Sequence, residues 1–209
     1  VEDFWNGGAL DPESNVQFGE GGAGTFSDGK LNTLVKDKFG RSRYVLETFV
    51  KFGAPEDILY VAKPHVGTDV LQGMISRMRQ EIIRLGGTFH FSTKVTDLHI
   101  EDGRISKIEL NHKEWKDVSG VILAIGHSAR DTFEMLYERK VPMMAKSFAV
   151  GMRVEHPQDM INESQYGRNA DMTLLPTAAY KVTHQSSNGR GVYSFCMCPG
   201  GYVVNASSE

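Results

Sequence analysis

The chain has 209 residues, of which 40% are hydrophobic and 23% are charged, and its formal net charge is −3. This length can bury a hydrophobic core, and the slightly acidic balance excludes the basic field that nucleic-acid binding requires. No apolar run approaches the roughly 18 residues that span a bilayer, and the N-terminus lacks a basic-then-apolar signal pattern, so we expect a cytoplasmic protein.

The first distinctive stretch is glycine-rich and leads from Asn15 to Leu31. Five glycines lie there beside two hydroxyls, a carboxylate and an ammonium. Glycine backbone can approach a ligand closely and can adopt positive φ, so its N–H groups can converge on an anion. The residues that we expect to contact a phosphate-bearing cofactor are Gly19, Gly21, Gly22, Gly24, Thr25, Ser27, Asp28 and Lys30.

The spacing Gly19-x-Gly21-x-x-Gly24 also satisfies the dinucleotide-binding pattern, which requires a buried strand before it and a helix directly after it. Ser14 to Phe18 is too polar for a central parallel strand, and Gly29 interrupts a helix. This context argues against an ordinary first Rossmann turn. A surface turn without a ligand is the other interpretation.

Helical patterns follow the glycine-rich stretch. Arg41 to Phe52 has apolar residues at helical spacing, and Pro55 can open a short helical turn through Leu59. The clearest helix is Thr68 to Leu85, where one apolar stripe follows Thr68 as the expected N-cap. We expect this stripe to pack against a sheet.

A series of strands is predicted next, over Thr88 to Thr93, Val95 to Ile100, Arg104 to Leu110 and Val118 to Ile125. Asp102-Gly103 between two alternating segments indicates a hairpin, and Asn111 to Asp117 is expected to be a looser connection. The last segment is almost entirely apolar, which is typical of a buried parallel strand.

Gly126 closes this buried strand, and a helix capped by Ser128 is expected to continue through Arg139. A strand end beside a helix start is where ligands bind in α/β sheets. A plain junction between a strand and a helix is the alternative.

From Ser147 onward the pattern becomes β-like and includes an Asn188-Gly189 hairpin signal. The predicted strands are Phe148 to Val154, Tyr180 to His184, Gly191 to Cys196 and Tyr202 to Ala206. We expect a mostly antiparallel sheet domain here.

The two cysteines, Cys196 and Cys198, are one residue apart in sequence. That spacing seldom permits a disulfide, and two ligands are too few for a zinc site, so we predict no metal. One interpretation is a pair of inert thiols in a strand, and the other is a redox or nucleophilic thiol at Cys198.

Four motifs in this order resemble a family of largely uncharacterised FAD-dependent dehydrogenases with glutathione-reductase-like flavin domains. They are Phe18-Gly-Glu-Gly-Gly-Ala-Gly-Thr-Phe-Ser-Asp-Gly-Lys-Leu31, Lys63-Pro-His-Val-Gly-Thr68, Ala124-Ile-Gly-His-Ser-Ala-Arg-Asp-Thr132 and Ser194-Phe-Cys-Met-Cys-Pro-Gly-Gly201. The resemblance implies an α/β fold, with a partial FAD-binding domain over residues 1–146. Residues 147–209 would then form part of a β-rich substrate domain.

The same resemblance implies FAD as the cofactor, with NAD(P)H as a co-substrate and an organic substrate of unknown identity. It adds Val95, whose backbone would read the adenine, and Ala124 and Gly126, which would allow close approach of the nucleotide. Family members carry an upstream Gly-x-Gly-x-x-Gly unit and a later return to the flavin domain. We therefore expect an internal fragment that retains no stoichiometric FAD and is inactive by itself.

Catalytic residues are not defined by the sequence, although His65, Lys30 and Cys198 are candidates, together with His127. Histidine exchanges protons near neutral pH, and Lys30 could stabilise a reduced flavin, whereas ordinary structural or solvated roles are the alternatives. The predicted function is electron transfer between an organic substrate and flavin. The competing hypotheses are a non-catalytic flavin- or nucleotide-binding module and a nucleotide-independent α/β binding domain.

The predicted strand Val118 to Ile125 would lack parallel neighbours within this chain. An unpaired strand edge recruits other chains, so we also expect self-association.

Overall fold

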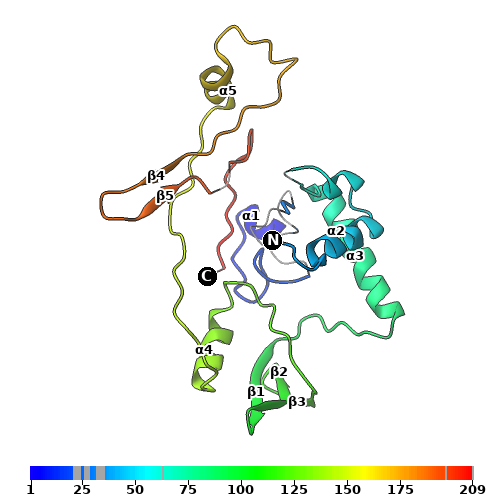
Figure 1. Cartoon of the computed structure of the whole chain (residues 1–209). Helices are drawn as coiled ribbons and strands as arrows, with labels where there is room; N and C mark the ends of the chain where they lie inside the picture. Colours follow the sequence, from blue (N-terminus) through cyan, green and yellow to red (C-terminus); the bar gives the residue numbers. More distant parts are fainter. Residues whose placement is uncertain (21–24, 26–28, 32–35, 63, 196, 209) are drawn as a thin grey trace. The chain divides into compact units, whose positions relative to one another are not determined.

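The computed structural model describes residues 1–20, 25, 29–31, 36–62, 64–195 and 197–208. Contacts divide the chain into two compact units. Unit 1 comprises Val1–Ala145 and Ala206–Glu209, and unit 2 comprises Lys146–Asn205. Unit 2 is therefore inserted into unit 1 in chain order (Figure 1). The assignment of residues 1–146 and 147–209 to a flavin domain and a substrate domain stays a prediction.

The core of unit 1 is helical. After a short α1 (Glu2–Trp5), α2 (Arg41–Lys51), the 3₁₀ turn η2 (Glu56–Leu59) and α3 (Thr68–Arg84) gather together (Figure 1). These elements confirm the predicted helices, except that Gly67 rather than Thr68 occupies the N-cap of α3. The expectation that the apolar stripe of α3 packs against a sheet is wrong, because Leu71 and Met74 pack in a cluster with residues of η2 and α2. The buried core residues are Ala54, Ile58, Val66, Leu71 and Met74.

A three-stranded antiparallel sheet follows, in the order β1 (Val95–Glu101), β2 (Arg104–Leu110) and β3 (Glu114–Asp117). The β1–β2 hairpin is confirmed, because Asp102 and Gly103 adopt the positive φ values of 49° and 73° that its tight turn requires. Helix α4 (Arg130–Glu138) contacts β1, and Leu98 of β1 and Leu136 of α4 are buried.

Several strand predictions in unit 1 are wrong. Thr88 to Thr93 forms no strand, and the expected connection at Asn111 to Asp117 contains β3. The predicted buried strand Val118 to Ile125 has no regular structure, and Ile122 is 95% exposed. A central parallel strand requires a hydrogen-bonded strand on each side. Among the described residues, both sheets are antiparallel, and neither includes residues 118–125.

The predicted cap of α4 is also corrected. The helix begins at Arg130 with Ala129 as its N-cap, while the hydroxyl of Ser128 lies near the His127 ring instead. The helix itself is confirmed.

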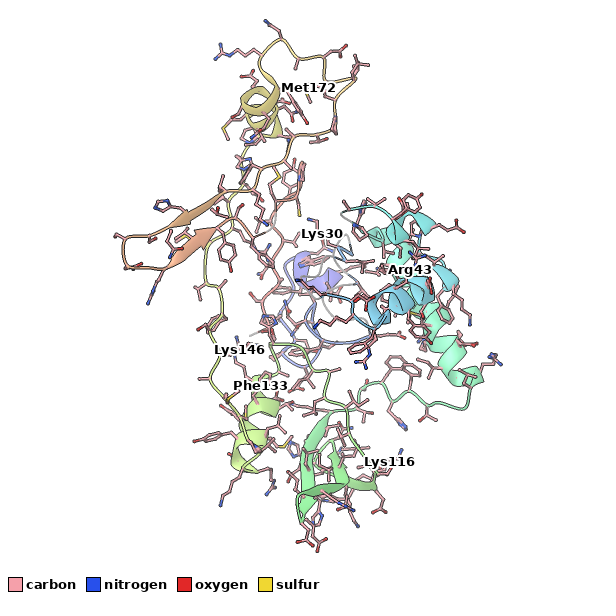
Figure 2. All side chains as sticks on the ribbon, in the orientation of Figure 1. Lys30, Arg43, Lys116, Phe133, Lys146 and Met172 are labelled. Carbon is pink, nitrogen blue, oxygen red and sulfur yellow. The ribbon has the colours of Figure 1, made fainter. Side chains whose placement is uncertain are left out.

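Unit 2 contains α5 (Gln158–Tyr166) and a hairpin of β4 (Thr183–Gln185) and β5 (Gly191–Tyr193). The Asn188-Gly189 turn is confirmed, with Gly189 at φ 81°. Predicted strands over Phe148 to Val154 and Tyr202 to Ala206 are not formed. Figure 2 shows side chains spread along extended chain in this unit.

Helix α5 was not predicted. Its start and end carry ordinary signals, because Pro157 precedes it and Gly167 ends it at φ 87°. The β-like composition around it favoured strands instead. The described part of the chain combines helices with antiparallel sheets.

Among the described residues, no helix has the length and apolar character needed to cross a membrane.

Candidate cofactor site

The glycine-rich segment is described only at its ends and at Thr25. The predicted cofactor residues outside the described part of the chain are Gly21, Gly22, Gly24, Ser27 and Asp28. Their contacts stay predictions. Of the described members, Gly19 is exposed and Thr25 is buried.

An ion pair holds the N-terminal end of this segment against α3. Glu20 Oε1 lies 3.4 Å from Arg79 Nε, and each side chain is only about a quarter exposed. The guanidinium of Arg79 also lies over the ring of Phe91, at 5.6 Å from its centroid. Because the two charges are partly shielded from water, their attraction is screened less than that of a surface pair.

Backbone pairing holds the C-terminal end of the segment against the residues that precede α3. The N–H of Leu31 donates to the carbonyl of Pro64 at 2.9 Å, and the N–H of Val66 donates to the carbonyl of Gly29 at 3.1 Å. Gly29 has φ 66°, and a Cβ there would lie 3.3 Å from Cβ of Val66. Backbone conformation and close approach therefore both favour glycine at this position.

These two hydrogen bonds place Lys30 opposite His65 in an antiparallel bridge. The bonds come from the flanking residues, so the two form a non-hydrogen-bonded pair, whose Cα atoms in such ladders lie about 4.5 Å apart with side chains on one face. Both residues are exposed (Lys30 is labelled in Figure 2). The structure thus brings together two of the four candidate catalytic residues, although they are 35 positions apart in sequence.

Val95 lies elsewhere in unit 1, at the start of β1 and opposite Leu110. It lines a groove of about 310 Å³ between the sheet and α4. The other lining residues are Lys94, Thr96, Asp97, Glu109, His112, Asp131, Thr132, Glu134, Met135, Glu138 and Arg139. The groove is consequently polar and rich in carboxylates.

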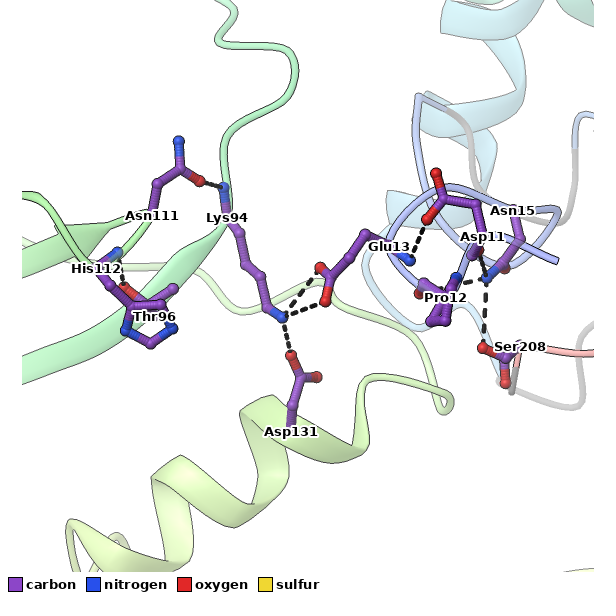
Figure 3. A network of polar contacts seen from close by, with 10 residues as sticks. All are labelled: Asp11, Pro12, Glu13, Asn15, Lys94, Thr96, Asn111, His112, Asp131 and Ser208. Atoms are coloured by element: carbon purple, nitrogen blue, oxygen red, sulfur yellow. Dashed lines mark hydrogen bonds and ion pairs between the residues drawn. The ribbon is translucent and has the colours of Figure 1, made fainter. Parts of the chain in front are cut away.

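Lys94 is the centre of the polar network at one end of this groove (Figure 3). Its Nζ lies 2.9 Å from Glu13 Oε1 and 2.5 Å from Asp131 Oδ2. The hydrogen bonds that Lys94 donates to Asp131 and, secondly, to Glu13 raise the pKa of Lys94, and the bond that Asp131 accepts from Lys94 lowers the pKa of Asp131. The ammonium thereby connects the N-terminal segment, the start of β1 and the first turn of α4.

The turn after β2 fixes the backbone of this region. The N–H of Lys94 donates to Asn111 Oδ1 at 2.8 Å, and the N–H of His112 donates to Thr96 Oγ1 at 2.9 Å (Figure 3). Thr96 in turn donates to Glu109 Oε2 at 2.7 Å. The residues flanking Val95 therefore have defined positions.

Asp97 and Arg139 close the other end of the groove. Arg139 Nε donates to Asp97 Oδ1 at 2.6 Å, and a second contact joins Arg139 Nη2 to the other carboxylate oxygen. This two-pronged arrangement lowers the pKa of Asp97 mainly through the Arg139 hydrogen bond.

Ala124 and Gly126, the remaining predicted cofactor residues, are exposed and lie outside any strand. The expected strand end that would present them to a nucleotide is absent from this part of the described chain. Their contact with a cofactor stays a prediction. His127, the fourth catalytic candidate considered from sequence, is exposed and neighbours the Ser128 hydroxyl.

Cys198 is exposed in the turn that precedes Gly200. Cys196 lies outside the described residues, so a shared environment of the two thiols is untested. No group of three or more potential metal-ligating side chains occurs among the residues that the structure describes.

Sequence reasoning missed Asn15, which is buried. Its side-chain amide donates to the carbonyls of Asp11 at 3.0 Å and Ser208 at 3.5 Å (Figure 3). Its Oδ1 accepts from the N–H of Gln17 at 3.0 Å. The side-chain amide of Gln17 also donates to the carbonyl of Ala206 at 3.0 Å. An Asn side chain often hydrogen-bonds to the backbone two residues later in a turn, and this signal could have identified the bond between Asn15 and Gln17.

The network around Lys94 was also missed. Its members come from three separate elements, and no spacing in the sequence places Glu13 beside Lys94. The one available signal was the position of Lys94 directly before Val95.

Two comparisons place the chain among known proteins. A family model described as "FAD-dependent protein, C-terminal domain-like" matches residues 147–209. A curated relative from Clostridium beijerinckii (strain ATCC 51743 / NCIMB 8052), named only as an uncharacterized protein, is 53% identical over 210 residues. The match covers 100% of this chain and 39% of the relative, so the chain spans about two fifths of the relative's length. The family-model match supports a flavoprotein-related family.

The described residues fit a phosphate-bearing cofactor at the glycine-rich segment. Lys30 and His65 present an ammonium and an imidazole side by side at its anchored end, and both groups can donate hydrogen bonds to an anion. The Val95 groove is a poorer site for phosphate, because its carboxylates outnumber its cationic side chains. The adenine contact predicted for Val95 stays a prediction.

Proposed function

We propose that this chain is part of an FAD-dependent, dehydrogenase-like oxidoreductase that passes electrons between an organic substrate and the flavin. NAD(P)H is the second electron partner in this proposal. The observation that carries it is the Lys30–His65 pair at the anchored end of the glycine-rich segment. The match of residues 147–209 to an FAD-dependent C-terminal domain supports the redox class.

The residues of the glycine-rich segment would hold the cofactor. Gly21, Gly22 and Gly24 leave its backbone free of side chains, and Thr25 and Ser27 add hydroxyls that can bond to polar groups of the cofactor. Anchors at Glu20 and Gly29 hold both ends of the segment against α3 and the residues before it. A segment fixed at both ends loses less conformational freedom when it binds a ligand.

Bound flavin supplies the redox chemistry, while the protein supplies orientation and electrostatics. The Lys30 ammonium can stabilise negative charge placed near it, and His65 can take up or release a proton at a ring nitrogen. Their cross-strand backbone pairing would keep both groups on one face. This arrangement would place a cation and a proton-exchanging group at one point of the cofactor.

Flavin content of the full-length protein tests the site. We expect Gly22→Val to abolish bound flavin, measured by absorbance in the flavin band, because a branched side chain would keep the backbone away from the cofactor. Gly120→Val is the matched control, since a Cβ at Gly120 meets no atom within 4 Å. Unchanged flavin content in Gly22→Val would contradict the site.

Anaerobic mixing with NADPH or NADH tests the activity. Bleaching of the flavin band would support the oxidoreductase, and Lys30→Met should slow the bleaching rate per bound flavin. A yellow protein that neither nicotinamide nor a panel of organic donors reduces would favour the non-catalytic flavin-binding module.

A further inference from the structure

Unit 2 contains a hydrogen-bonded pair of ionisable side chains that the proposed function has not used. His156 Nε2 lies 3.0 Å from the hydroxyl of Tyr180, and the two ring centroids are 5.6 Å apart. His156 immediately precedes Pro157 and α5, and Tyr180 follows the loop after that helix. The chain before and after α5 therefore runs side by side (Figure 1).

The side-chain amides of Gln158 and Asn162 hold together the two segments that carry this pair. Gln158 Nε2 donates to the carbonyl of Ala178 at 2.8 Å, and the N–H of Ala178 donates to Asn162 Oδ1 at 3.0 Å. Ala178 is 1% exposed. Gln158 Oε1 also accepts from the N–H of Gly200 at 3.0 Å, which adds the turn after Cys198 to the same cluster. These hydrogen bonds hold the segment that carries His156 against the segment that carries Tyr180.

The second nitrogen of His156 is unusual. Among the described residues, the buried side-chain nitrogen and oxygen atoms without a hydrogen-bond partner are His156 Nδ1 and the two atoms of the Glu20–Arg79 ion pair. His156 Nδ1 has no such charged neighbour to compensate it. A histidine with a purely structural role would normally use both nitrogens, since buried polar atoms are rarely left unbonded.

This environment determines the direction of the hydrogen bond. A neutral imidazole carries one N–H and one bare nitrogen, and burying a bare acceptor costs less than burying an N–H without an acceptor. We therefore assign the proton to Nε2, which donates to the oxygen of Tyr180. The hydroxyl oxygen of Tyr180 then accepts from His156, and the hydroxyl proton points away from His156, where it can be donated to a ligand.

We propose that Tyr180, oriented by His156, is a hydrogen-bond donor that binds an anionic or carbonyl oxygen of the substrate. The inference rests on the proposed function, because oxidation or reduction of an organic substrate commonly changes the charge on an oxygen next to the reacting carbon. Tyr180 is the substrate-binding residue, and His156 is a positioning residue. The ligand class is a small oxyanion or carbonyl compound such as a phenolate, enolate or carboxylate.

The probe for this site is 4-nitrophenolate, whose visible absorption band shifts when its oxygen accepts a hydrogen bond. In the full-length protein we expect saturable binding with a shift of that band from its position in water. Tyr180→Phe should abolish the shift and weaken binding about tenfold or more, because the lost bond is to a charged group. Tyr202→Phe is the matched control, since Tyr202 is an exposed tyrosine of the same unit.

Two variants of His156 separate positioning from packing. His156→Gln retains an N–H donor and should preserve most of the shift, whereas His156→Leu fills similar space without a donor and should lose it. Equal effects of these two variants would overturn the positioning role. Binding and shift unchanged in Tyr180→Phe, or no binding by the wild-type protein, would overturn the proposal as a whole.

Flavin absorbance recorded on the same samples keeps the two proposals distinct. A wild-type protein without flavin that still binds the probe through Tyr180 would contradict the proposed function alone. A yellow, reducible protein in which Tyr180→Phe changes nothing would contradict this inference alone.

Discussion

The helical core of unit 1 buries its apolar side chains, whereas the extended segments of unit 2 expose theirs. In unit 1, Val66, Leu71 and Met74 are nearly inaccessible. In unit 2, Phe148, Val150, Met152 and Val154 alternate along the chain, and each is at least 73% exposed. The difference follows from how each kind of element buries a side chain.

A helix completes its backbone hydrogen bonds by itself, so a few neighbouring turns are sufficient to form a core. A strand completes its bonds only against another strand, and its apolar face stays exposed without one. The residues of α2, η2 and α3 find their partners within about 45 positions. The alternating segment Phe148 to Val154 finds no ladder partner among the described residues. The two regions therefore differ in whether the packing partners of an apolar residue lie nearby in the sequence.

The same substitution in both regions gives the largest expected contrast. Met74→Ala should lower the free energy of unfolding by about 2–5 kcal/mol, because Met74 is 1% exposed and its loss leaves a cavity. Met152→Ala, at a position that is 94% exposed, should change it by less than about 0.5 kcal/mol. Urea unfolding of the two variants measures both values. Equal losses would mean that residue 152 is buried in solution.

Gly29 and Gly103 compare the edge of the core with an open turn. Both have positive φ, but only Gly29 would bring its Cβ close to another side chain, at 3.3 Å from Val66. Gly103→Ala should cost about 1 kcal/mol from backbone conformation, and Gly29→Ala about 2–3 kcal/mol. Thermal unfolding of the pair measures the difference. A smaller loss for Gly29→Ala would show that the bridge to residues 64–66 is not formed.

Ile122 lies in unit 1 but resembles the exposed segments of unit 2. The segment 118–125 forms no strand edge, but its apolar side chains are exposed, so we expect the 209-residue chain to self-associate through them. Ile122→Lys should weaken that association about tenfold, or ~1.4 kcal/mol. Size-exclusion chromatography over a range of concentrations measures the shift. Glu114→Lys, a change of charge in β3, is the control and should leave the elution unchanged. A strictly monomeric wild-type chain would contradict the prediction.

The smallest expected effect is at the surface of the sheet. Asp97 has a pKa below its ordinary 3.8 because of the hydrogen bond from Arg139. The ionised carboxylate therefore stabilises the fold at pH values above the pKa that Asp97 has in the unfolded state. That stabilisation should be lost as the pH falls through the folded-state pKa. Asp97→Asn should cost about 0.5–1 kcal/mol at neutral pH and much less at pH 2. An equal loss at both pH values would assign the effect to packing.

Sequence reasoning succeeded where structure is local. The helical spacing of α3, its end at about Leu85 and the Asp102-Gly103 turn each depend on residues a few positions apart, and each prediction is confirmed. The helix after Gly126 is confirmed for the same reason, although its cap is not.

It failed where structure depends on distant partners. The apolar composition of Val118 to Ile125 indicates burial, but composition does not supply the neighbouring strands that would provide it. Similarly, Lys30 and His65 were both considered as candidates, yet their pairing depends on hydrogen bonds at Gly29 and Pro64 that no motif encodes. His156 and Tyr180 were not considered, because α5, which brings them together, was read as part of a β region.

The contacts of Asn15 and Gln17 with the end of the chain have a consequence for synthesis on the ribosome. These hydrogen bonds join residues 193 and 189 positions apart. At about 5–20 residues per second, Asn15 emerges roughly 10–40 s before its partner at residue 208. Unit 2 is translated entirely within that interval. The N-terminal segment must therefore wait, with its buried amide still solvated, until the intervening unit has been made.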